Sequence, residues 1–291
     1  MQIILDHVSF TYSKRRKNRP LAGPLVLGKL QLTVDKGEML AVAGKSGSGK
    51  STFLQLLKGF LSPSEGNLYL DRTDPHLNRQ PEQFDRIGFI FQYPEHQLFS
   101  TTVYEDIAFG LRSAKLSPEI QEAKVRKAMQ AVQLDYGKFK DRSPFELSGG
   151  EKRRVAIAGV VVLEPEVLIL DEPTAGLDLQ SRTALFDLLH AMNREQGITI
   201  IWVSHQLEEI LEHAARMIAL KAGQFVADGA PSVLLSDPAL LQAFDWEEPP
   251  ALAVSRILRE LGAAVQDNRP LTALEAAGAI LALHQNRQVS I

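Results

Sequence analysis

Cysteine is absent from the 291 residues of the chain. This absence excludes a disulfide framework, a cysteine-ligated zinc or iron–sulfur centre, and a thiol nucleophile. Long apolar runs are missing too: the best candidate, residues 155–163, is far shorter than the roughly 20 residues that a membrane-spanning helix needs. The first residues lack the basic flank and apolar core of a signal peptide, so we expect neither a membrane span nor an export signal.

An excess of positive charge is missing as well. The 32 basic and 35 acidic residues give a formal net charge of −3. No bulk positive field therefore exists to hold nucleic acid, and we expect no nucleic-acid partner. A short basic stretch, residues 14–17, is interpreted as a solvated loop. The apolar fraction of 45% excludes global disorder, and the length predicts about two compact units.

Short apolar runs alternate with helical patterns through much of the chain. Continuous apolar strands separated by helices are typical of a parallel sheet that is covered on both faces. The first part of the chain differs, because apolar and polar residues alternate in residues 3–5, 8–12 and 30–34, which predicts an antiparallel sheet beside the parallel one. The strands predicted for the parallel sheet are residues 39–43, 87–91, 167–170 and 198–203, and the clearest helices between them are residues 50–58 and 179–196.

A region without strand signals interrupts this alternation. Its best helix start is Ser117-Pro118-Glu119, where a capping hydroxyl, a proline at the first helical position and an acid follow each other, and this helix is expected to run to about Leu134. We therefore predict a helical insertion at about residues 94–160, inside an α/β domain that covers residues 1–244.

The pattern changes again near the C-terminal end. Pro249 and Pro250 predict a linker, because proline stops a preceding helix. Two amphipathic helices follow at about residues 251–261 and 272–284, so residues 245–291 form a C-terminal extension. Two helices of this length are marginal in isolation, and their apolar faces need a partner surface. That surface is either the chain's own core or another subunit.

A glycine-rich segment follows the first predicted parallel strand. It reads Gly44-Lys45-Ser46-Gly47-Ser48-Gly49-Lys50-Ser51-Thr52 and fits the phosphate-binding P-loop pattern. Glycines allow successive backbone N–H groups to point at phosphate oxygens, and the helix that begins near Lys50 adds the positive end of its dipole. Lys50 can reach the β- and γ-phosphates of a nucleotide, and the Ser51 hydroxyl can ligate Mg²⁺.

An apolar strand that ends in two acids supplies further chemistry. Carboxylates at the carboxyl edge of a parallel strand face the crevice in which ligands bind. Asp171 can hold Mg²⁺ through its water shell, which leaves Glu172 free to polarise an attacking water. An isolated Asp-Glu pair is usually a solvated loop start, but the P-loop in the same chain favours the functional interpretation.

A second glycine-containing helix start is Ser148-Gly149-Gly150, inside the sequence LSGGE. It can bind an anion, or it is an ordinary capped helix in which Arg153 and Arg154 are solvated or paired. The order of P-loop, LSGGE, acidic strand and Ser204-His205 resembles the ATP-binding cassette (ABC) ATPases. The loop Pro173–Asp178 is similar to theirs as well, and the resemblance covers about residues 1–230.

The resemblance implies a P-loop NTPase fold and a two-site sandwich dimer. Each ATP would lie between the P-loop of one subunit and Ser148–Gly150 of the other. Tyr12 has Phe10 as a neighbouring aromatic residue, and it can also be an ordinary tyrosine of a strand without any contact to a nucleotide. Carried over by position, the resemblance assigns Tyr12 to adenine stacking, Gln92 to Mg²⁺ and the attacking water, Asp178 to the link between the two sites, and His205 to the γ-phosphate.

Two segments indicate a subclass. Residues 91–99 (FQYPEHQLF) and 102–110 (TVYEDIAFG) resemble the ATPases of energy-coupling factor (ECF) importers and of their cobalt and nickel relatives. Residues 145–160 are closer to the second of the two paired ATPases. The resemblance implies a second ATPase subunit, in a homodimer or a heterodimer, and a transmembrane coupling subunit that binds a groove in the helical insertion.

It also implies a separate membrane subunit that binds a vitamin or a transition-metal ion, and a peripheral location at the cytoplasmic face of the cell membrane. The C-terminal extension would pair with the tail of the partner ATPase. Two other interpretations stay open: the ATPase of an ordinary binding-protein-dependent importer, and a soluble ABC ATPase of DNA repair or translation. The single P-loop and the lack of long heptad repeats disfavour the soluble class.

Overall fold

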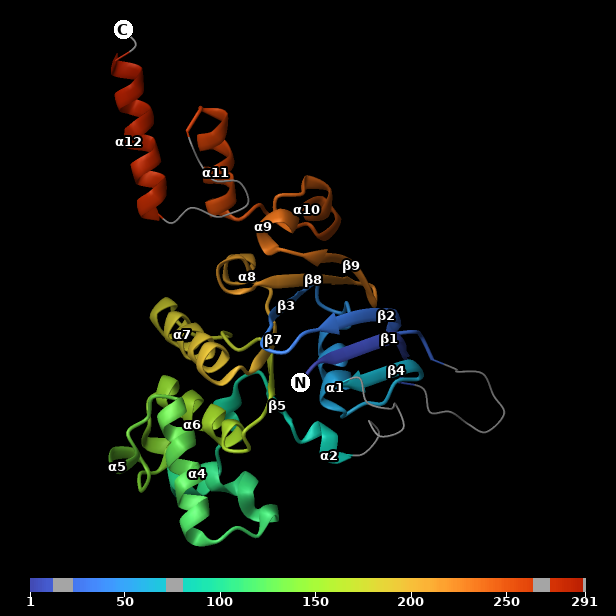
Figure 1. The fold of residues 1–291 in the computed structure, drawn as a ribbon, viewed down its shortest axis with the longest axis vertical. Coiled ribbons are helices and arrows are strands. Elements are labelled where there is room, and N and C mark those ends of the chain that lie inside the picture. The colour runs from blue at the N-terminus through green and yellow to red at the C-terminus, as the bar shows by residue number, and fades with distance from the viewer. Residues whose placement is uncertain (13–22, 72–80, 264–272, 290–291) are drawn as a thin grey trace.

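The computed structural model describes residues 1–12, 23–71, 81–263 and 273–289 (Figure 1). The predicted basic loop at residues 14–17 and the predicted start of the last helix, Thr272, lie outside them. The elements in chain order are β1 (Ile3–Phe10), β2 (Leu27–Val34), β3 (Met39–Ala43), α1 (Lys50–Lys58), β4 (Glu65–Leu70), α2 (Pro81–Phe84), β5 (Ile87–Ile90), η2 (Pro94–Gln97), α3 (Val103–Ala108), η3 (Phe109–Ala114), α4 (Pro118–Ala131), α5 (Tyr136–Phe139), η4 (Pro144–Glu146), α6 (Gly149–Val161), β6 (Val167–Asp171), α7 (Leu179–Gln196), β7 (Thr199–Val203), α8 (Leu207–His213), β8 (Arg216–Lys221), β9 (Gln224–Gly229), α9 (Pro231–Leu234), α10 (Pro238–Phe244), α11 (Pro250–Glu260) and α12 (Ala273–Val289).

The main sheet has the strand order β5-β6-β7-β3-β8-β9. Its first five strands are parallel, and β9 pairs with β8 in the antiparallel sense. The predicted parallel sheet is thus confirmed, with strand ends that differ by one residue from the prediction at Ile90, Asp171 and Thr199. Strands β8 and β9 were not predicted from the sequence.

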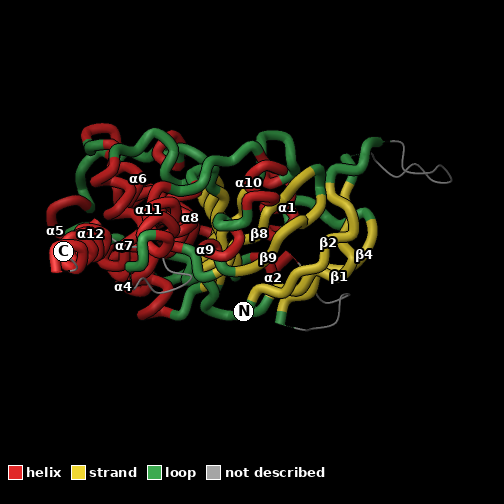
Figure 2. Tube along the Cα trace, turned by 90° about the horizontal axis from the view of Figure 1, so that it is seen from above, coloured by secondary structure: helices red, strands yellow, loops and turns green. Residues whose placement is uncertain are grey.

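Both faces of the main sheet are covered, which explains why its strands are apolar throughout. Leu40 and Val42 of β3 pack with Phe53 of α1 and with the smaller sheet, whereas Ala41 and Ala43 pack on the opposite face with α6 and α7. The two helices that begin at the predicted anion-binding segments, α1 and α6, therefore lie against opposite faces of one sheet. Figure 2 shows this layering.

The smaller sheet is antiparallel, as predicted, with the order β2-β1-β4. It contains one strand, β4, that the sequence analysis missed. The predicted strand that runs to Tyr12 ends at Phe10 instead, because the pairing of β1 with β2 shifts register at Val8 and again at Phe10. Tyr12 consequently lies beyond the sheet, where its ring is not constrained by strand pairing.

The predicted helical insertion consists of η2, α3, η3, α4, α5, η4 and α6, which gather at one end of the molecule in Figure 1. The expected start of α4 is confirmed: the Ser117 hydroxyl accepts a hydrogen bond from the Ile120 N–H, and Pro118 is the first helical residue. The helix ends at Ala131, three residues before the predicted end at Leu134.

The helices of the C-terminal extension stand at the opposite end of the molecule (Figure 1). Pro250 is the first residue of α11, since a proline tolerates that position, rather than the last residue of a linker. Leu252 and Leu258 of α11 are buried, and Leu252 belongs to the same apolar core as α6 and α7, whereas Ile257 and Leu261 are exposed. Among the described residues, no helix combines the length and the apolar character that crossing a bilayer requires.

Candidate active site

The carboxyl ends of four neighbouring parallel strands carry the predicted residues. In the sheet order β5-β6-β7-β3, these strands are followed by Gln92, by Glu172, by His205 and by the P-loop. The order of the strands along the chain is different. The fold therefore brings together groups that lie far apart in the sequence, at the edge of the sheet where ligands of open α/β sheets bind.

The backbone of the P-loop requires its glycines. Gly44, Gly47 and Gly49 all have positive φ, at 154°, 77° and 106°. A Cβ atom on Gly44 would lie 2.3 Å from the Leu220 carbonyl oxygen, so a side chain would displace the loop from β8. Gly49 precedes α1 without any side-chain cap. The first N–H groups of this helix are thus left for a ligand, as an anion site requires.

Lys50 is folded back into the P-loop. Its Nζ atom donates hydrogen bonds to the carbonyl oxygens of Gly44, at 2.7 Å, and Lys45, at 2.9 Å. Burial lowers the pKa of the Lys50 ammonium, and the negative charges of Glu172 and Asp171 oppose this shift. The ammonium is therefore held at the centre of the loop and close to both acids. The Lys45 side chain instead forms an ion pair with Asp245 of the C-terminal extension.

Asp171 lies beside the P-loop helix. Burial raises the pKa of its carboxyl, a hydrogen bond with the Ser51 hydroxyl lowers it, and the charge of Glu172 raises it further. A hydroxyl, a carboxylate and the Gln92 amide are hard oxygen donors of the kind that Mg²⁺ prefers. The buried Ser48 hydroxyl of the P-loop has no hydrogen-bond partner among the described residues. These residues fit a Mg²⁺-bound nucleotide.

Glu172 contacts the two other predicted catalytic residues. Its Oε2 atom accepts a hydrogen bond from Gln92 Nε2 at 3.2 Å and lies 3.5 Å from His205 Nδ1. The backbone of Glu172 has φ 49°, and its N–H donates to the Val203 carbonyl oxygen. A positive φ is strained for a residue with a side chain, and such strain is typical of functional sites. The structure thus joins Glu172, Gln92 and His205 into one cluster.

Tyr12 lies at the edge of this site. Its hydroxyl is 3.0 Å from the Thr52 Oγ1 atom of α1. The Tyr12 ring is 62% exposed, whereas Phe10, which it contacts edge to face, is buried. Of these two neighbouring aromatic residues, Tyr12 is therefore the one whose ring face is open to a ligand. Its stacking on adenine stays a prediction.

The LSGGE segment is built differently. Ser148 caps α6: its Oγ atom accepts a hydrogen bond from the Glu151 N–H, and the Glu151 carboxylate accepts from the Ser148 N–H in return. A Cβ atom on Gly149 or Gly150 would meet no described heavy atom within 4 Å. This helix end is open, and α6 packs on the sheet face opposite α1. Asp178 does not join the cluster either, but caps α7 through the Ser181 N–H.

Two buried charges were not predicted as parts of the site. Arg153, expected to be solvated or paired, is 4% exposed and forms a two-bond pair with Glu95, at 2.9 and 3.0 Å. It also donates to the carbonyl oxygens of Pro173 and Ala175, in the loop after Glu172. The second is Glu209 of α8. Arg153 belongs to the charged run of residues 151–154 at the start of α6, and nothing in that run distinguished it from Arg154. Nothing in the sequence marked Glu209 either.

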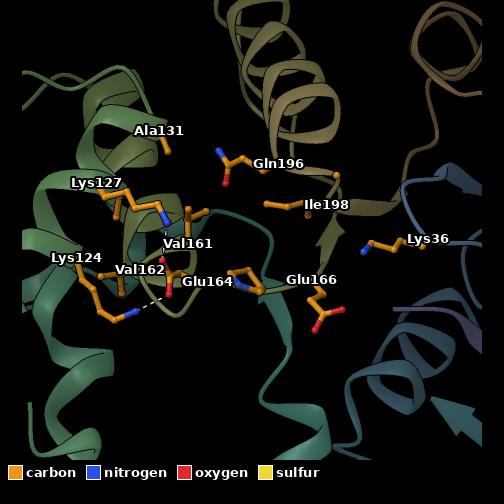
Figure 3. Close-up of a pocket in the computed structure, with 13 residues that line it drawn as sticks. Lys36, Lys124, Lys127, Ala131, Val161, Val162, Glu164, Glu166, Gln196 and Ile198 are labelled. Atoms are coloured by element: carbon orange, nitrogen blue, oxygen red, sulfur yellow. Dashed lines mark hydrogen bonds and ion pairs between the residues drawn. The ribbon is translucent and has the colours of Figure 1, made fainter. Parts of the chain in front are cut away.

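A hollow of about 340 Å³ lies elsewhere, between α4, α6 and the loop that leads into β7 (Figure 3). Two of its three lysines share one acid: Lys124 and Lys127 both contact Glu164, at 2.5 and 2.6 Å, whereas Lys36 lies on the other side of the hollow. The hollow is at the amino ends of β6 and β7, whereas the cluster of Glu172 is at their carboxyl ends. It contains none of the residues predicted for the nucleotide site.

The P-loop follows β3, Asp171 and Glu172 stand at the end of β6 two strands away, and the LSGGE helix α6 covers the other sheet face. This combination defines an ATPase of the ABC class. Residues 27–175 match the ABC transporter family model. An energy-coupling factor transporter ATP-binding protein, EcfA2 of Clostridium tetani, is 40% identical over 270 residues, which cover 92% of each chain.

Solved structures agree with this similarity. The structure of cbiO1 from Clostridium perfringens, described as part of the ABC transporter complex cbiONQ, has a TM-score of 0.72 and 33% identity, and covers 83% of this chain and 93% of that one. A dimeric ATP-binding cassette bound to ADP and Pi has a TM-score of 0.65 and 28% identity, over 79% of this chain and 98% of that one. The chain belongs to the family of ECF transporter ATP-binding proteins. The family and the fold predicted from the motifs are thereby confirmed.

Proposed function

We propose that this ATP-binding subunit hydrolyses ATP at two sites that it forms with a second ATPase subunit. The observation that carries the proposal is the position of the two anion-binding helix ends on opposite faces of one sheet. The P-loop end has Lys50, Asp171 and Glu172 around it, whereas the end at Ser148 has none of them. A second chain, in a homodimer or a heterodimer, would bring its own Ser148 segment to the open side of the P-loop.

We assign the roles of the cluster as follows. Lys50 would exchange its two carbonyl partners for the β- and γ-phosphate oxygens, and Ser51, Asp171 and Gln92 would hold Mg²⁺. The Mg²⁺ ion, when bound, neutralises charge on these phosphates. Glu172 polarises the attacking water, and His205 contacts the γ-phosphate. This assignment is supported by the contacts of Gln92 and His205 with Glu172, because they hold its carboxylate among the other residues at the carboxyl ends of the strands.

The helical insertion would bind the membrane partner. A groove of about 450 Å³ is lined by Glu95, His96, Leu98, Pro144, Phe145, Gly149 and Lys152. Phe145 is 61% exposed there, and Phe99 is exposed nearby. Exposed aromatic side chains beside a groove are typical of protein-binding surfaces. We propose that this groove receives a transmembrane coupling subunit and thereby holds the chain at the cytoplasmic face of the cell membrane. A further membrane subunit would bind the vitamin or transition-metal ion.

The C-terminal extension would supply a contact that does not depend on nucleotide. One face of α11 is buried against the chain's own core, so part of the extension packs on that core. The other face exposes Ile257 and Leu261. We propose that this exposed face pairs with the tail of the second ATPase. ATP holds a sandwich dimer only while it is bound, and the pair needs such a contact after hydrolysis.

Purification of the tagged chain from detergent-solubilised membranes tests the partners. Mass spectrometry is expected to identify a second ATPase and at least one multi-span membrane protein. The variant Phe145→Asp should lose the membrane protein and keep the second ATPase. Val226→Asp, which changes an exposed apolar residue of β9 outside the groove, should keep both. Recovery of the chain without any membrane protein would refute the proposal.

A further inference from the structure

A buried carboxylate connects the two loops that leave the active site. Glu209 of α8 is 8% exposed. Its Oε2 atom accepts a hydrogen bond from the Thr174 hydroxyl at 2.9 Å and another from the Ser204 hydroxyl at 3.0 Å. Both are hydrogen bonds to an ionised group, which are stronger than bonds between neutral partners.

The two hydroxyls stand next to residues of the proposed mechanism. Thr174 is in the loop between Glu172 and Asp178, and Ser204 directly precedes His205. The Ser204 Oγ atom also accepts a hydrogen bond from the Gln206 N–H at 3.0 Å. Its single proton is therefore directed at Glu209. The carboxylate fixes the orientation of this hydroxyl and, through it, the start of the His205 loop.

Arg182 frames the same pair of loops from the first turn of α7. Its Nε atom donates to the Leu177 carbonyl oxygen at 2.9 Å, and its Nη1 atom contacts the Gln206 side chain. The second carboxylate oxygen of Glu209 lies 3.7 Å from Arg182 Nη1 and has no hydrogen-bond partner among the described residues. Burying a charge with incomplete pairing is costly, so stability alone does not explain a carboxylate at this position.

We propose that Glu209 is a positioning residue that holds the His205 loop and the 173–178 loop as one unit. Neither loop can move alone without breaking a hydrogen bond to this carboxylate. The contact of His205 with the γ-phosphate and the cross-subunit contact of Asp178 would then form and separate together. The inference rests on the roles proposed above for His205 and Asp178, and it adds a residue through which those roles are coupled.

Nucleotide affinities in a hydrolysis-blocked background test this coupling. In full-length chain with its partner subunits and Glu172→Gln, Glu209→Ala should weaken ATP binding about tenfold, the effect expected for loss of one charged hydrogen bond. ADP affinity should change less than about twofold, because ADP lacks the γ-phosphate that His205 contacts. Glu209→Gln keeps an acceptor oxygen for both hydroxyls and should retain most of the ATP preference.

Variants that remove one of the two hydroxyl contacts of Glu209 distinguish the effects of the two loops. Ser204→Ala should reduce the preference for ATP over ADP, because it releases the His205 loop. Thr174→Val should leave that preference intact and lower turnover in the Glu172 parent, because it releases the loop that carries Asp178. Glu208→Ala provides the matched control, since this neighbouring acid on the same helix is exposed, and it should leave both properties unchanged.

Three outcomes would overturn the proposal. Glu209→Ala could weaken ATP and ADP equally together with a lower melting temperature, which is the result of a purely structural role. It could leave both affinities unchanged. Glu209→Gln could behave like Glu209→Ala. The variant His205→Ala keeps this test separate from the proposed function. If His205→Ala preserves the preference for ATP over ADP, the proposed role of His205 is wrong. If His205→Ala abolishes that preference and Glu209→Ala does not, only the proposed role of Glu209 is wrong.

Discussion

The helix starts at Lys50 and Gly149 are both suited to an anion, but they are built in opposite ways. The first has no side-chain cap, and two of its three glycines pack tightly: a Cβ atom on Gly44 would lie 2.3 Å from the Leu220 carbonyl oxygen, and one on Gly49 would lie 2.8 Å from Leu27. The second has a complete capping box between Ser148 and Glu151, and its glycines meet nothing in their own chain. We call the P-loop end, with Lys50, Asp171 and Glu172, the finished half of the site. The exposed helix end at Ser148–Gly150 is the open half.

In the proposed dimer, this difference would divide the catalytic site between two chains. The P-loop half joins β3 to α1, and its charges are already assembled, since Lys50 lies close to Asp171 and Glu172 in the single chain. The Ser148 hydroxyl is also held by Glu151, to which it donates a hydrogen bond at 2.8 Å. A phosphate oxygen from a partner's nucleotide must compete for that hydroxyl. The open half thus keeps its own capping contacts, and under the proposed function it takes part in catalysis only when a partner's nucleotide contacts it.

The largest effect is expected for a change in the finished half. Glu172→Gln should lower steady-state turnover by about 10²–10⁴, the usual loss when a general base is removed, and leave Mg·ATP affinity intact. The proposed phosphate contacts do not involve this carboxylate, so the variant should also trap a closed dimer. Hydrolysis and nucleotide affinity are measured together, with Glu212→Gln as an exposed-acid control. Turnover within about threefold of the parent would remove Glu172 from the role.

The second prediction addresses the open half. Gly149→Asp places a side chain where the chain itself has free space, at the first position of α6, where an acid is favourable to the helix dipole. Folding and ATP binding to the same chain's P-loop should be unchanged. Turnover should fall about 10–100-fold, because the new carboxylate repels the partner's phosphates.

Gly44→Ala is the matched opposite. Its Cβ atom would overlap the Leu220 carbonyl oxygen, and the variant should lose both stability and ATP binding. Thermal melting and nucleotide titration of Gly44→Ala and Gly149→Asp test whether the two helix ends differ in this way. Equal loss of ATP binding in Gly149→Asp and Gly44→Ala would contradict the division into a finished half and an open half.

A third prediction concerns the junction between the halves. Gln92 lies between β5 and the helical insertion and contacts Glu172, so it can transmit the presence of the γ-phosphate to the insertion. Gln92→Ala should bind ATP with nearly the parental affinity and lose most of the transport in reconstituted vesicles. Gln130→Ala, an exposed residue of α4, serves as control. Unchanged uptake at saturating ATP would refute the coupling role.

The sequence predicted what depends on local pattern. Continuous apolar runs located β3, β6 and β7, and glycine spacing located the P-loop. It missed β9, where Gln224–Gly229 alternates exposed and half-buried residues and owes its place to β8. Contacts such as that of Arg153 with Glu95 depend on packing between distant elements, which no local pattern encodes. The end of the strand before Tyr12 was also misplaced, because the register shifts of β1 depend on its pairing with β2.

The smallest effect is expected outside both halves. Ile257→Asp changes the exposed face of α11, so folding, ATP binding and the buried contacts of Leu252 and Leu258 should be retained. If the extension pairs with the partner's tail, this variant loses association only in nucleotide-free buffer, because the ATP sandwich does not depend on the tail. Truncation after Asp245 should do the same, although it also removes Leu252 from the core and should lower the melting temperature.

Size-exclusion chromatography of each variant mixed with partner subunits, with and without ATP, tests the tail contact, and Glu260→Gln on the same helix is the control. The comparison of Ile257→Asp with the truncated chain is needed to identify the tail contact. Truncation alone cannot separate a lost tail contact from a weakened core, whereas Ile257→Asp leaves the core side of α11 untouched. If Ile257→Asp remains associated without nucleotide while the truncated chain dissociates, the extension acts through its own core and the proposed tail pairing is wrong. If both dissociate and both reassociate with ATP, the tail is a third contact that is independent of the finished and open halves.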